Sequence, residues 1–440
     1  MKKLIAVLLA LLIVAVPMFA QGAEEKKPEA TSAASESKPV TIEFWTHEDA
    51  NRQALEDRYI AEFKETHPNV TVNVTRQSSE KLIELIQTAF AAGQGPTMFN
   101  LSIEDEYPLI AAGRVAPIDY EAAGYKDAKA VKDAYLAGIL DAVTVDGDVY
   151  GLPLELTNWS IFINKKVFRD AGLDPEKDYP KTWEDMVEVS KKLVIREGDI
   201  LVRRGYDFRY GYYLVNNMPM VEQLGGKLIS DDGKEAIVGE DAWVKFLTYM
   251  QNWGPNGENL GSPTYTAARK LFNKDNNDIA MCSTGMYQEA RILKDNPDFY
   301  NSGEWMVVPY PKFKNAVKDV AGCYYGHFYM VNADADEATQ AAAWSLISYM
   351  LSHGEEYLKN VGIIQPTTAL MNSDTYKNMP YADVFTKDLE RGHIVYYGAN
   401  SSEIQDLIKT AVEAVMLQGV DPKQAYLQLK ASAQEILDEQ

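Results

Sequence analysis

Residues 40–75 read VTIEFWTHEDANRQALEDRYIAEFKETHPNVTVNVT, and this stretch decides the fold. Val40–Trp45 alternates apolar and polar side chains as a strand does, and Ala50–Thr66 has the pattern of a helix. Pro68 closes that helix, and Val70–Thr75 alternates again. Because a helix between two strands is typical of a crossover, the order strand, helix, strand predicts neighbouring parallel strands.

The same order continues along the chain. Ser79–Ala92 is an amphipathic helix, and Thr97–Leu101 is a third strand. A second run begins at Trp159–Asn164 and continues into a helix that Thr182 caps. The remaining predicted elements are strands at 278–282, 305–308 and 324–331, and helices at 334–351, 402–417 and after Pro422. The pattern predicts an α/β protein of two lobes with open, mainly parallel sheets.

The first 39 residues are predicted to lie outside the lobes. Two lysines precede the apolar run Leu4–Val16, and Pro17 and small residues follow it, so residues 1–23 resemble a secretory signal peptide. Residues 24–39 are rich in Glu, Lys, Ala, Ser and Pro, which predicts a disordered spacer. No cysteine follows the signal to carry a lipid. We therefore expect a free protein secreted to the periplasm.

Composition restricts the function classes. The chain has 440 residues, 46% of them hydrophobic, and 64 acidic against 43 basic residues give a net charge of −21. So acidic a chain is a poor partner for nucleic acid or anionic lipid. Two cysteines exclude a disulfide scaffold, and whether Cys282 and Cys323 pair stays open. The unusual feature is an aromatic surplus of 26 Tyr and 7 Trp.

Motifs for catalysis are missing from the sequence. There is no GxSxG, no GxxxxGK[ST] and no GxGxxG segment, and the five histidines lack metal-ligand spacing. No basic cluster for a phosphate or another strongly anionic ligand is visible along the chain. We therefore expect no catalytic residues, no metal and no cofactor.

Aromatic side chains at the ends of predicted elements indicate a ligand cleft instead. Trp45 ends the first strand, where open parallel sheets place their ligands, although it also suits packing under the next loop. Ser102 and Asp105 follow the third strand, as helix caps or as acceptors for hydroxyl groups. Flat aromatic rings pack on the C–H faces of sugars, while carboxylates and amides bind their hydroxyl groups. A neutral polyol fits this set best.

From Val40 onward the chain resembles the extracellular solute-binding proteins of ABC transporters, in particular the sugar-binding group that includes maltose-binding protein. The segments that carry the resemblance are VTIEFW (40–45), AAGQGPTMF (91–99), DGDVYGLPLELTNWSIFINKKVF (146–168), YPKTWED (179–185), DIAMCSTGMYQEARI (278–292), VVPYPK (307–312), AAAWSLISYMLS (341–352) and GIIQP (362–366). Their order and spacing cover nearly all of the chain after the spacer.

The resemblance implies two α/β lobes joined by a multi-crossing hinge, as in periplasmic binding proteins. Lobe one would comprise residues 40–156 plus 326–368, and lobe two residues 157–325 plus 369–440. The crossings would fall near Glu155–Asn158, Gly322–Gly326 and Pro366–Met371. The ligand-binding residues implied by position are Trp45, His47, Glu48, Ser102, Glu104 and Asp105 in lobe one, Asn158 and Trp159 at the hinge, Tyr212, Gly285, Tyr287 and Tyr396 in lobe two, and Gly322, Tyr324, Tyr325 and Gln365 at the later crossings. Tyr287 stands where maltose-binding protein has a Trp, so the resemblance does not imply maltose.

The implied function is a hinged trap. A sugar or oligosaccharide would be bound between the lobes of a monomer and delivered to ABC permease subunits in the membrane. Trp159→Ala is then expected to weaken ligand binding while the fold stays intact. Two alternatives stay open: a secreted carbohydrate-active enzyme, or a binding protein for a peptide or amino acid, whose carboxylate Arg203, Arg204 or Arg209 would bind.

Overall fold

The computed structural model describes residues 38–274, 278–325, 327–394, 398 and 400–439. For Ser79, Glu80, Glu104, Leu156, 323–325 and Ile394 it describes the backbone alone. The predicted signal peptide at 1–23 and all but the end of the predicted spacer at 24–39 lie outside the described residues.

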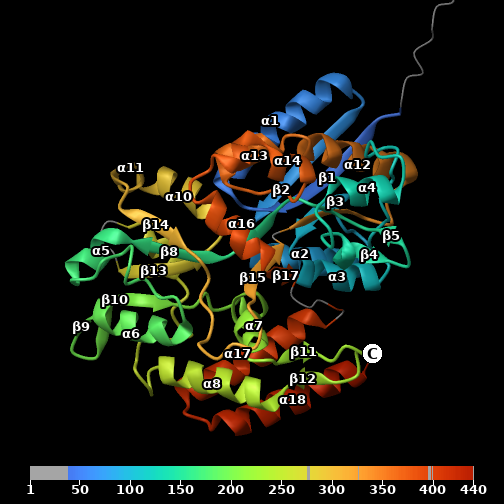
Figure 1. Ribbon diagram of the computed structural model, residues 1–440. Coiled ribbons are helices and arrows are strands. Elements are labelled where there is room, and N and C mark those ends of the chain that lie inside the picture. Colours follow the sequence, from blue (N-terminus) through green and yellow to red (C-terminus); the bar gives the residue numbers. More distant parts are fainter. Residues whose placement is uncertain (1–37, 275–277, 326, 395–397, 399, 440) are drawn as a thin grey trace, which may run out of the picture. The chain divides into compact units, whose positions relative to one another are not determined.

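The first lobe is built on a five-stranded sheet. Its strand order is β2-β1-β3-β16-β6, with β1 at Val40–His47, β2 at Val70–Gln77, β3 at Met98–Leu101, β16 at Phe328–Val331 and β6 at Leu152–Pro153. Its main helices are α1 (Ala50–Thr66), α2 (Ser79–Ala91), α3 (Ile103–Ala111), α4 (Ala128–Ala134), α12 (Glu337–Leu351) and α13 (Gly354–Val361). Figure 1 shows α1 and α12 on one side of the strands and α2 and α3 on the other. The elements predicted over residues 40–101 are confirmed.

Local chemistry explains the start of this lobe. Ile42 and Phe44 of β1 are fully buried, which is the apolar face that the alternation predicts. At the end of β1 the Asp49 carboxylate accepts hydrogen bonds from the backbone N–H of Asn51 (2.9 Å) and Arg52 (3.1 Å), so it caps α1. The short turn between β1 and α1 therefore brings polar side chains to the carboxyl end of the sheet.

The second lobe has its own five-stranded sheet. Its order is β14-β8-β13-β10-β9, with β14 at Trp305–Val308, β8 at Ser160–Asn164, β13 at Ile279–Thr284, β10 at Ile200–Asp207 and β9 at Ile195–Glu197. Its longer helices are α6 (Trp183–Leu193), α7 (Tyr213–Gln223), α8 (Glu240–Trp253), α10 (Tyr287–Asp295), α17 (Ser401–Leu417) and α18 (Pro422–Asp438). The predicted cap of α6 is confirmed, because Thr182 Oγ1 accepts from the backbone N–H of Asp185 at 3.0 Å.

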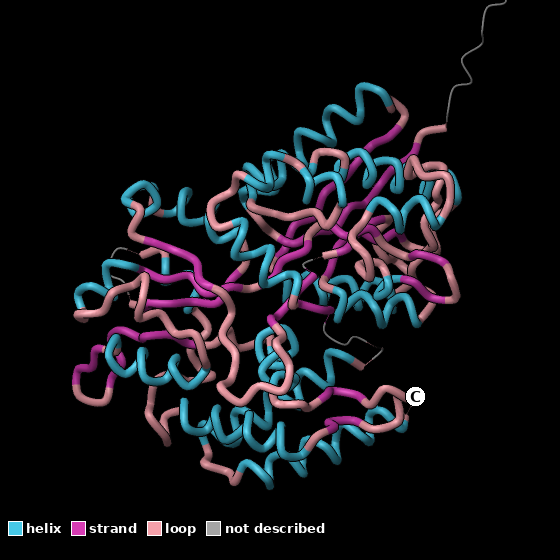
Figure 2. Tube along the Cα trace, in the orientation of Figure 1, coloured by secondary structure: helices cyan, strands magenta, loops and turns pink. Residues whose placement is uncertain are grey.

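A third, three-stranded sheet joins strands that run between the lobes. Its order is β17-β15-β7, with β17 at Gly392–Ile394, β15 at Ala321–Tyr325 and β7 at Leu156–Asn158. The sequence predicts one strand over 324–331, whereas the structure has two, β15 and β16, in different sheets. The chain thus leaves one sheet and enters another within a few residues (Figure 2).

The sheets are mixed rather than mainly parallel. β1 pairs in parallel with β2 and β3, and β10 pairs in parallel with β13. β16 runs antiparallel to β3, and β8 runs antiparallel to both β13 and β14. β16 and β8 each follow directly after a strand of the three-stranded sheet, and β9 is joined to its antiparallel partner β10 by a short turn, so a helical crossover sets the direction of none of these three strands.

The remaining elements are short and lie in the connections. They are η1 (Asp141–Val143), β4 (Thr144–Val145), β5 (Asp148–Val149), α5 (Lys165–Asp170), β11 (Lys227–Ile229), β12 (Ala236–Val238), α9 (Ala268–Phe272), α11 (Pro297–Ser302), α14 (Thr368–Asn372), α15 (Asp374–Lys377) and α16 (Ala382–Glu390). No helix of the described residues is both long enough and apolar enough to cross a bilayer.

Most of the tryptophans lie in the cores. Six of the seven tryptophans are buried, and Trp45 is partly buried against the first lobe's core. The second lobe's largest cluster contains Trp159, Trp183, Trp243 and Trp253. Cys282 is a buried free thiol, and burial raises its pKa to about 12. Burial of these flat, large rings therefore stabilises both lobes.

Candidate functional site

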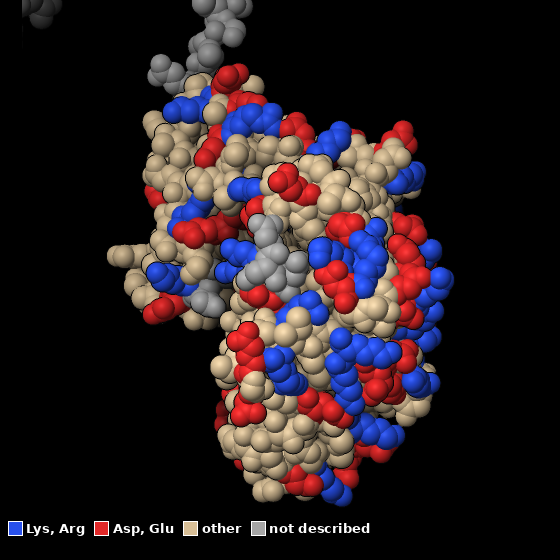
Figure 3. All heavy atoms as spheres, turned by 90° about the vertical axis from the view of Figure 1, so that its left-hand side faces the viewer, with Lys and Arg blue, Asp and Glu red and all other residues tan. Residues whose placement is uncertain are grey.

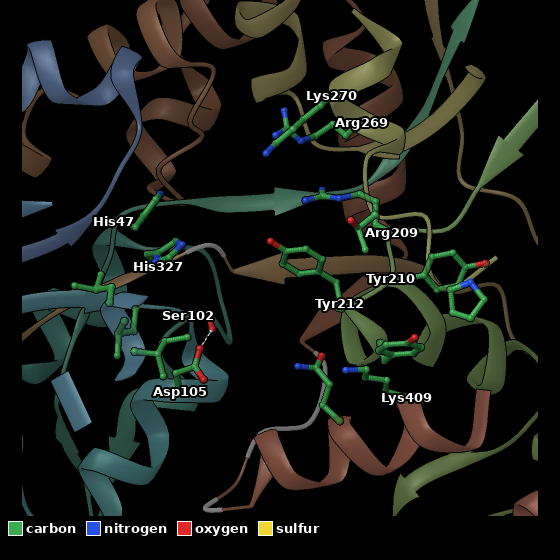
Figure 4. Close-up of a pocket in the computed structure, with 18 of the residues that line it drawn as sticks. His47, Ser102, Asp105, Arg209, Tyr210, Tyr212, Arg269, Lys270, His327 and Lys409 are labelled. Carbon is green, nitrogen blue, oxygen red and sulfur yellow. Dashed lines mark hydrogen bonds between the residues drawn. The ribbon is translucent and has the colours of Figure 1, made fainter. Parts of the chain in front are cut away.

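A cavity of about 630 Å³ lies between residues of the two lobes. This is a size typical of small-molecule sites. Figure 4 shows His47, His327, Ser102 and Asp105 on one side of it and Arg209, Tyr212, Arg269, Lys270 and Lys409 on the other. The other lining residues are Leu82, Ile83, Leu101, Tyr210, Gly211, Tyr213, Pro263, Thr266, Gln405 and Glu413.

A stacked pair of histidines forms part of the first lobe's wall. The rings of His47 and His327 lie 4.1 Å apart between centroids, with an interplanar angle of 26°. Arg52 Nη2 donates to the carbonyl oxygen of His47 (3.0 Å) and lies 3.2 Å from its Nδ1. β1 ends at His47 and β16 begins beside His327, so the pair exists only because β3 and β16 bring these segments together.

Both histidines are held in the neutral form. Burial, with the guanidinium of Arg52 close by, lowers the pKa of His327 to about 3. Burial and Arg52 also lower the pKa of His47 well below its ordinary value, and His327 adds to this. At neutral pH the pair therefore offers a flat, uncharged surface with ring nitrogens able to accept or donate hydrogen bonds.

Acid is expected to destabilise the protein through His327. A histidine with a depressed pKa stabilises the folded state fully above its unfolded pKa of about 6.5, and this contribution is lost as the pH falls toward 3. Between pH 7 and pH 5 the wild type should lose about 2 kcal/mol more unfolding free energy than His327→Phe, which keeps a stacked ring. Urea unfolding of both proteins at the two pH values measures the difference.

Other buried groups do not disturb that comparison. Burial raises the pKa of Glu155 and of Asp207 to about 7, which gives the opposite pH dependence in both proteins. The His327→Phe protein would contradict the expectation if its stability fell as steeply with acid as that of the wild type.

Ser102 and Asp105 continue the first wall at the start of α3. Ser102 Oγ donates to Asp105 Oδ2 at 2.7 Å, and Ser402 Oγ of α17 donates to Asp105 Oδ1 at 3.3 Å. The contact from Ser402 reaches Asp105 from the second lobe. Burial raises the pKa of Asp105, and the two hydroxyl groups oppose that shift.

Arg209 forms the centre of the opposite wall. Its guanidinium lies 4.0 Å from the Trp159 ring and 4.6 Å from the Tyr212 ring. Arg209 Nη1 donates to the Tyr287 hydroxyl at 2.7 Å. Stacking on two rings and one hydrogen bond fix the planar group, so its remaining N–H donors are pre-organised beside the cavity.

A second cavity of about 540 Å³ adjoins the first. The two share Arg269 and Lys270 as lining residues, and the second is also lined by Glu48, Asp49, Ala50, Asn51, Asn273, Lys274, Arg291, Lys294 and Asp295. Arg291 Nη2 of α10 lies 2.9 Å from Asp49 Oδ2 at the start of α1, so this ion pair links the two lobes. The second cavity thus forms a rim of the first cavity, and basic side chains contribute to its lining.

The structure brings four of the predicted ligand-binding residues together at the first cavity: His47, Ser102, Asp105 and Tyr212. Glu48 lines the second cavity. Only the backbone is described for Glu104, Tyr324 and Tyr325, and Tyr396 lies outside the described residues.

The other predicted residues lie behind the cavity walls. Trp159 is 2% exposed and lies under Arg209, and Tyr287 binds the same arginine. Asn158 Nδ2 donates to the carbonyl oxygen of Phe385 (2.6 Å), and Gln365 is buried. Gly322 is buried against Val215, and Trp45 packs on the first lobe's core. Direct contact of these residues with a ligand remains a prediction.

Gly285 has a packing role that can be tested. A Cβ atom at this position would lie 1.9 Å from Thr157 Oγ1 and 2.8 Å from the Tyr287 ring. Gly285→Ala is therefore expected to cost about 1–3 kcal/mol of unfolding free energy, because β7 and α10 must move apart. Thr157→Ala in the same chain should restore part of the loss in urea unfolding. If the double variant were less stable than Gly285→Ala alone, the clash would not be the cause.

The structure corrects one exclusion drawn from the sequence. Arg209, the neighbours Arg269 and Lys270, and Lys409 come from three distant parts of the chain, yet all four line the first cavity. The expectation that the chain has no basic cluster is therefore wrong. Of the three arginines that the sequence offers for a carboxylate, Arg209 lines the cavity, whereas Arg203 donates to the Leu193 carbonyl oxygen and Arg204 stacks on Tyr265. Only folding could reveal the cluster, because its members belong to three separate segments.

The face of the molecule that Figure 3 shows does not share the cationic bias of the first cavity. Figure 3 shows lysine and arginine side chains interspersed with aspartate and glutamate over one face of the molecule. Among the described residues, no group of three His, Cys, Asp or Glu side chains could hold a metal ion.

Known proteins resemble this chain along most of its length. The lactose-binding protein of Rhizobium radiobacter is 23% identical over 323 residues, covering 70% of this chain and 69% of that protein. The sn-glycerol-3-phosphate-binding periplasmic protein of Salmonella typhimurium is 22% identical over 414 residues, covering 88% and 90%. An ABC transporter solute-binding protein from Thermotoga lettingae, solved with α-D-tagatose, has a TM-score of 0.77 at 19% identity, covering 91% of this chain and 100% of that one.

The Thermotoga lettingae structure shares the fold described above. The family model of bacterial extracellular solute-binding proteins matches residues 49–357. This range contains every strand of the first lobe's sheet except β1, all strands of the second lobe's sheet, and Arg209. The chain belongs to the family of bacterial extracellular solute-binding proteins.

Proposed function

We propose that this protein is the extracytoplasmic component of an ABC importer that captures a carbohydrate between its two lobes. The observation that carries the proposal is the cavity itself, because both lobes supply its walls. Relatives named for lactose, maltotriose and arabinooligosaccharide binding support a sugar as the ligand. Tyr212, 39% exposed at the cavity, offers an aromatic face for a sugar ring.

Ligand binding would couple to lobe closure. A ligand that touches both walls binds the closed form more tightly, so it shifts the open–closed equilibrium by its differential affinity. Asp49–Arg291 and Asp105–Ser402 are direct contacts between the lobes beside the cavities, so they would form on closure. We place the lobe boundaries as the sequence predicts, at 40–156 plus 326–368 and 157–325 plus 369–440. The closed monomer would then dock on the permease subunits.

The proposed location is the periplasm. We infer that residues 1–23 are removed on secretion and that the protein is released without a lipid. Mass spectrometry of the mature protein from a periplasmic extract is the measurement, and an uncleaved N-terminus or a lipid adduct would contradict the proposal.

A thermal-shift panel tests the proposed ligand class. A ligand that binds only the folded state raises its stability by about 2.7 kcal/mol at a concentration of 100 Kd. We expect the melting temperature to rise with one or more saccharides and to stay unchanged with amino acids, peptides and polyamines. A rise with amino acids or peptides alone would overturn the carbohydrate assignment.

Tyr212→Ala is expected to weaken saccharide binding at least tenfold, about 1.4 kcal/mol, because the exposed ring leaves the cavity wall. Tyr179→Ala is the matched control, since Tyr179 stacks with Lys181 and does not line either cavity. Isothermal titration calorimetry with the saccharide found in the panel measures both. Equal affinity in the two variants would remove Tyr212 from the site.

The alternative of a secreted carbohydrate-active enzyme predicts a different result. Such an enzyme releases new reducing ends from an oligosaccharide, whereas a binding protein returns its ligand unchanged. We expect no reducing ends above the background of a denatured sample after incubation with the bound saccharide.

A further inference from the structure

The first cavity carries a net positive lining in a strongly acidic chain. Its cationic residues are Arg209, Arg269, Lys270 and Lys409, and its carboxylates are Asp105 and Glu413. The whole chain has a net charge of −21. Because the chain has 64 acidic and 43 basic residues, a random set of lining residues would contain more carboxylates than cations. The lining of the first cavity has the opposite balance.

The cationic residues of this lining lack carboxylate partners. Within the described part of the chain, none of these four residues has an ion pair. Asp105 instead accepts from two serine hydroxyl groups, and Asp49 of the rim already pairs with Arg291. Elsewhere even exposed lysines pair with nearby carboxylates, as Lys387 does with Asp383. Among the described residues, the four cations of the first cavity therefore have no carboxylate within ion-pair distance.

Three guanidinium groups are close enough to affect one another. Burial lowers the pKa of Arg269 to about 10, and the like charges of Arg291 and Arg209 contribute to that shift. Burial raises the pKa of the Tyr287 hydroxyl, but Arg209, Arg269 and Arg291 more than reverse this and lower it below its ordinary value. Arg209 and Arg269 of the first cavity and Arg291 of its rim are therefore within electrostatic reach of one another. An anion placed here would relieve the repulsion between the arginines.

The geometry of Arg209 suits an oxyanion. The guanidinium is planar, stacked on Trp159 and Tyr212, and fixed by its bond to the Tyr287 hydroxyl. A guanidinium held in one orientation can donate two parallel N–H bonds to a carboxylate or phosphate group. A neutral hydroxyl group would leave the charge of Arg209 without compensation.

We propose that the carbohydrate bound by this protein is acidic, and that Arg209, Arg269 and Lys270 bind its carboxylate or phosphate group. This inference rests on the proposed function. The sugar part would lie against Tyr212 and the His47–His327 pair, and the acidic group would face the shared wall of the two cavities. A ligand with several acidic groups would extend toward Lys274 and Lys294 at the rim, which Glu48, Asp49 and Asp295 also line.

Matched pairs of probes test the proposal on the full mature protein. Calorimetry compares digalacturonate with neutral galactobiose, and glucose 6-phosphate and glycerol 3-phosphate with glucose and glycerol. We expect at least one acidic probe to bind, its neutral counterpart to bind at least tenfold more weakly, and the affinity of the acidic probe to fall as NaCl rises from 50 to 300 mM. Binding of digalacturonate assigns a carboxylate, and binding of a phosphorylated probe assigns a phosphate.

Variants locate the acidic group. Arg209→Gln and Lys270→Gln are each expected to lower the affinity for the acidic probe at least tenfold, with a smaller loss in Arg209→Lys. The matched control is Lys387→Gln, which lies outside both cavities and should bind like the wild type. Lys270 is exposed, so its variant stays informative if Arg209→Gln does not fold.

The outcomes separate the two proposals. If a neutral saccharide binds as tightly as its acidic counterpart and salt has no effect, the acidic-ligand inference is overturned while the carbohydrate function stands. If neither neutral nor acidic saccharides bind, the proposed function itself is overturned, and this inference with it.

Discussion

Arg52→Met is expected to lower the free energy of unfolding by about 3 kcal/mol, because it leaves a buried carboxylate without its main partner. Arg52 Nε lies 3.0 Å from Glu56 Oε1, and both side chains are 1% exposed. Arg76 Nη2, 3.6 Å from Glu56 Oε2, remains in the variant and keeps the loss at the lower end of the range for buried pairs. Urea unfolding at pH 7 measures the change.

Arg58→Met in the same helix is the matched control. Arg58 pairs with Glu62 and Glu356 but is 45% exposed, so we expect a loss below about 1 kcal/mol. The double variant Arg52→Met with Glu56→Gln should recover part of the loss, since no unpaired charge remains buried. If Arg52→Met and Arg58→Met were equally stable, the buried pair would not stabilise the first lobe.

Trp159→Ala is expected to lower the free energy of unfolding by about 3–5 kcal/mol and also to weaken ligand binding. The ring is 2% exposed in the second lobe's core, so its removal leaves a cavity there. It also lies 4.0 Å from the Arg209 guanidinium, which loses its support. The sequence predicts that the fold of this variant stays intact, whereas the burial of the ring predicts a large loss of stability. Unfolding curves and calorimetry with the bound saccharide measure the two effects.

Trp344→Ala separates the effects on stability and binding. Trp344 is fully buried in the first lobe's core, and it does not line either cavity. Its loss should destabilise the protein by a similar amount but leave affinity unchanged at a temperature where both variants are folded. Equal affinities of the two variants would show that Trp159 does not position Arg209.

Local patterns were sufficient to predict most of the secondary structure. The strand at Val40 and the helix at 50–66 follow from hydrophobic periodicity, and the helices at Thr182 and Asp421 begin at side chains that accept backbone N–H bonds. These features depend on neighbours within a few residues. The break between β15 and β16 depends on distant residues instead. β15 pairs with β7 and β17, whereas β16 pairs with β3 and β6.

The candidate site could be predicted only in part. His47 ends β1, Ser102 follows β3, and Asp105 lies in the first turn of the next helix, α3. The order of strands in the sequence indicates that the ends of β1 and β3 meet. His327, Arg269 and Lys409 carry no such signal, because each reaches the cavity from a segment that joins the site only through the hinge or the second lobe. Of the predicted aromatic ligand contacts, Tyr212 lines the first cavity, whereas Trp159 packs in the second lobe's core, because rings at element ends also suit core packing.

The sequence by itself determined the α/β class, the two-lobed family fold and the position of its main elements, because periodicity, caps and segment order are local properties of the chain. Tertiary structure alone decided the charge of the cavity. A net charge of −21 describes the whole sequence, while the cavity is lined by four cations and two carboxylates drawn from distant segments. Electrostatic potential depends on distance in space, so a strongly acidic chain can still fold around a basic site.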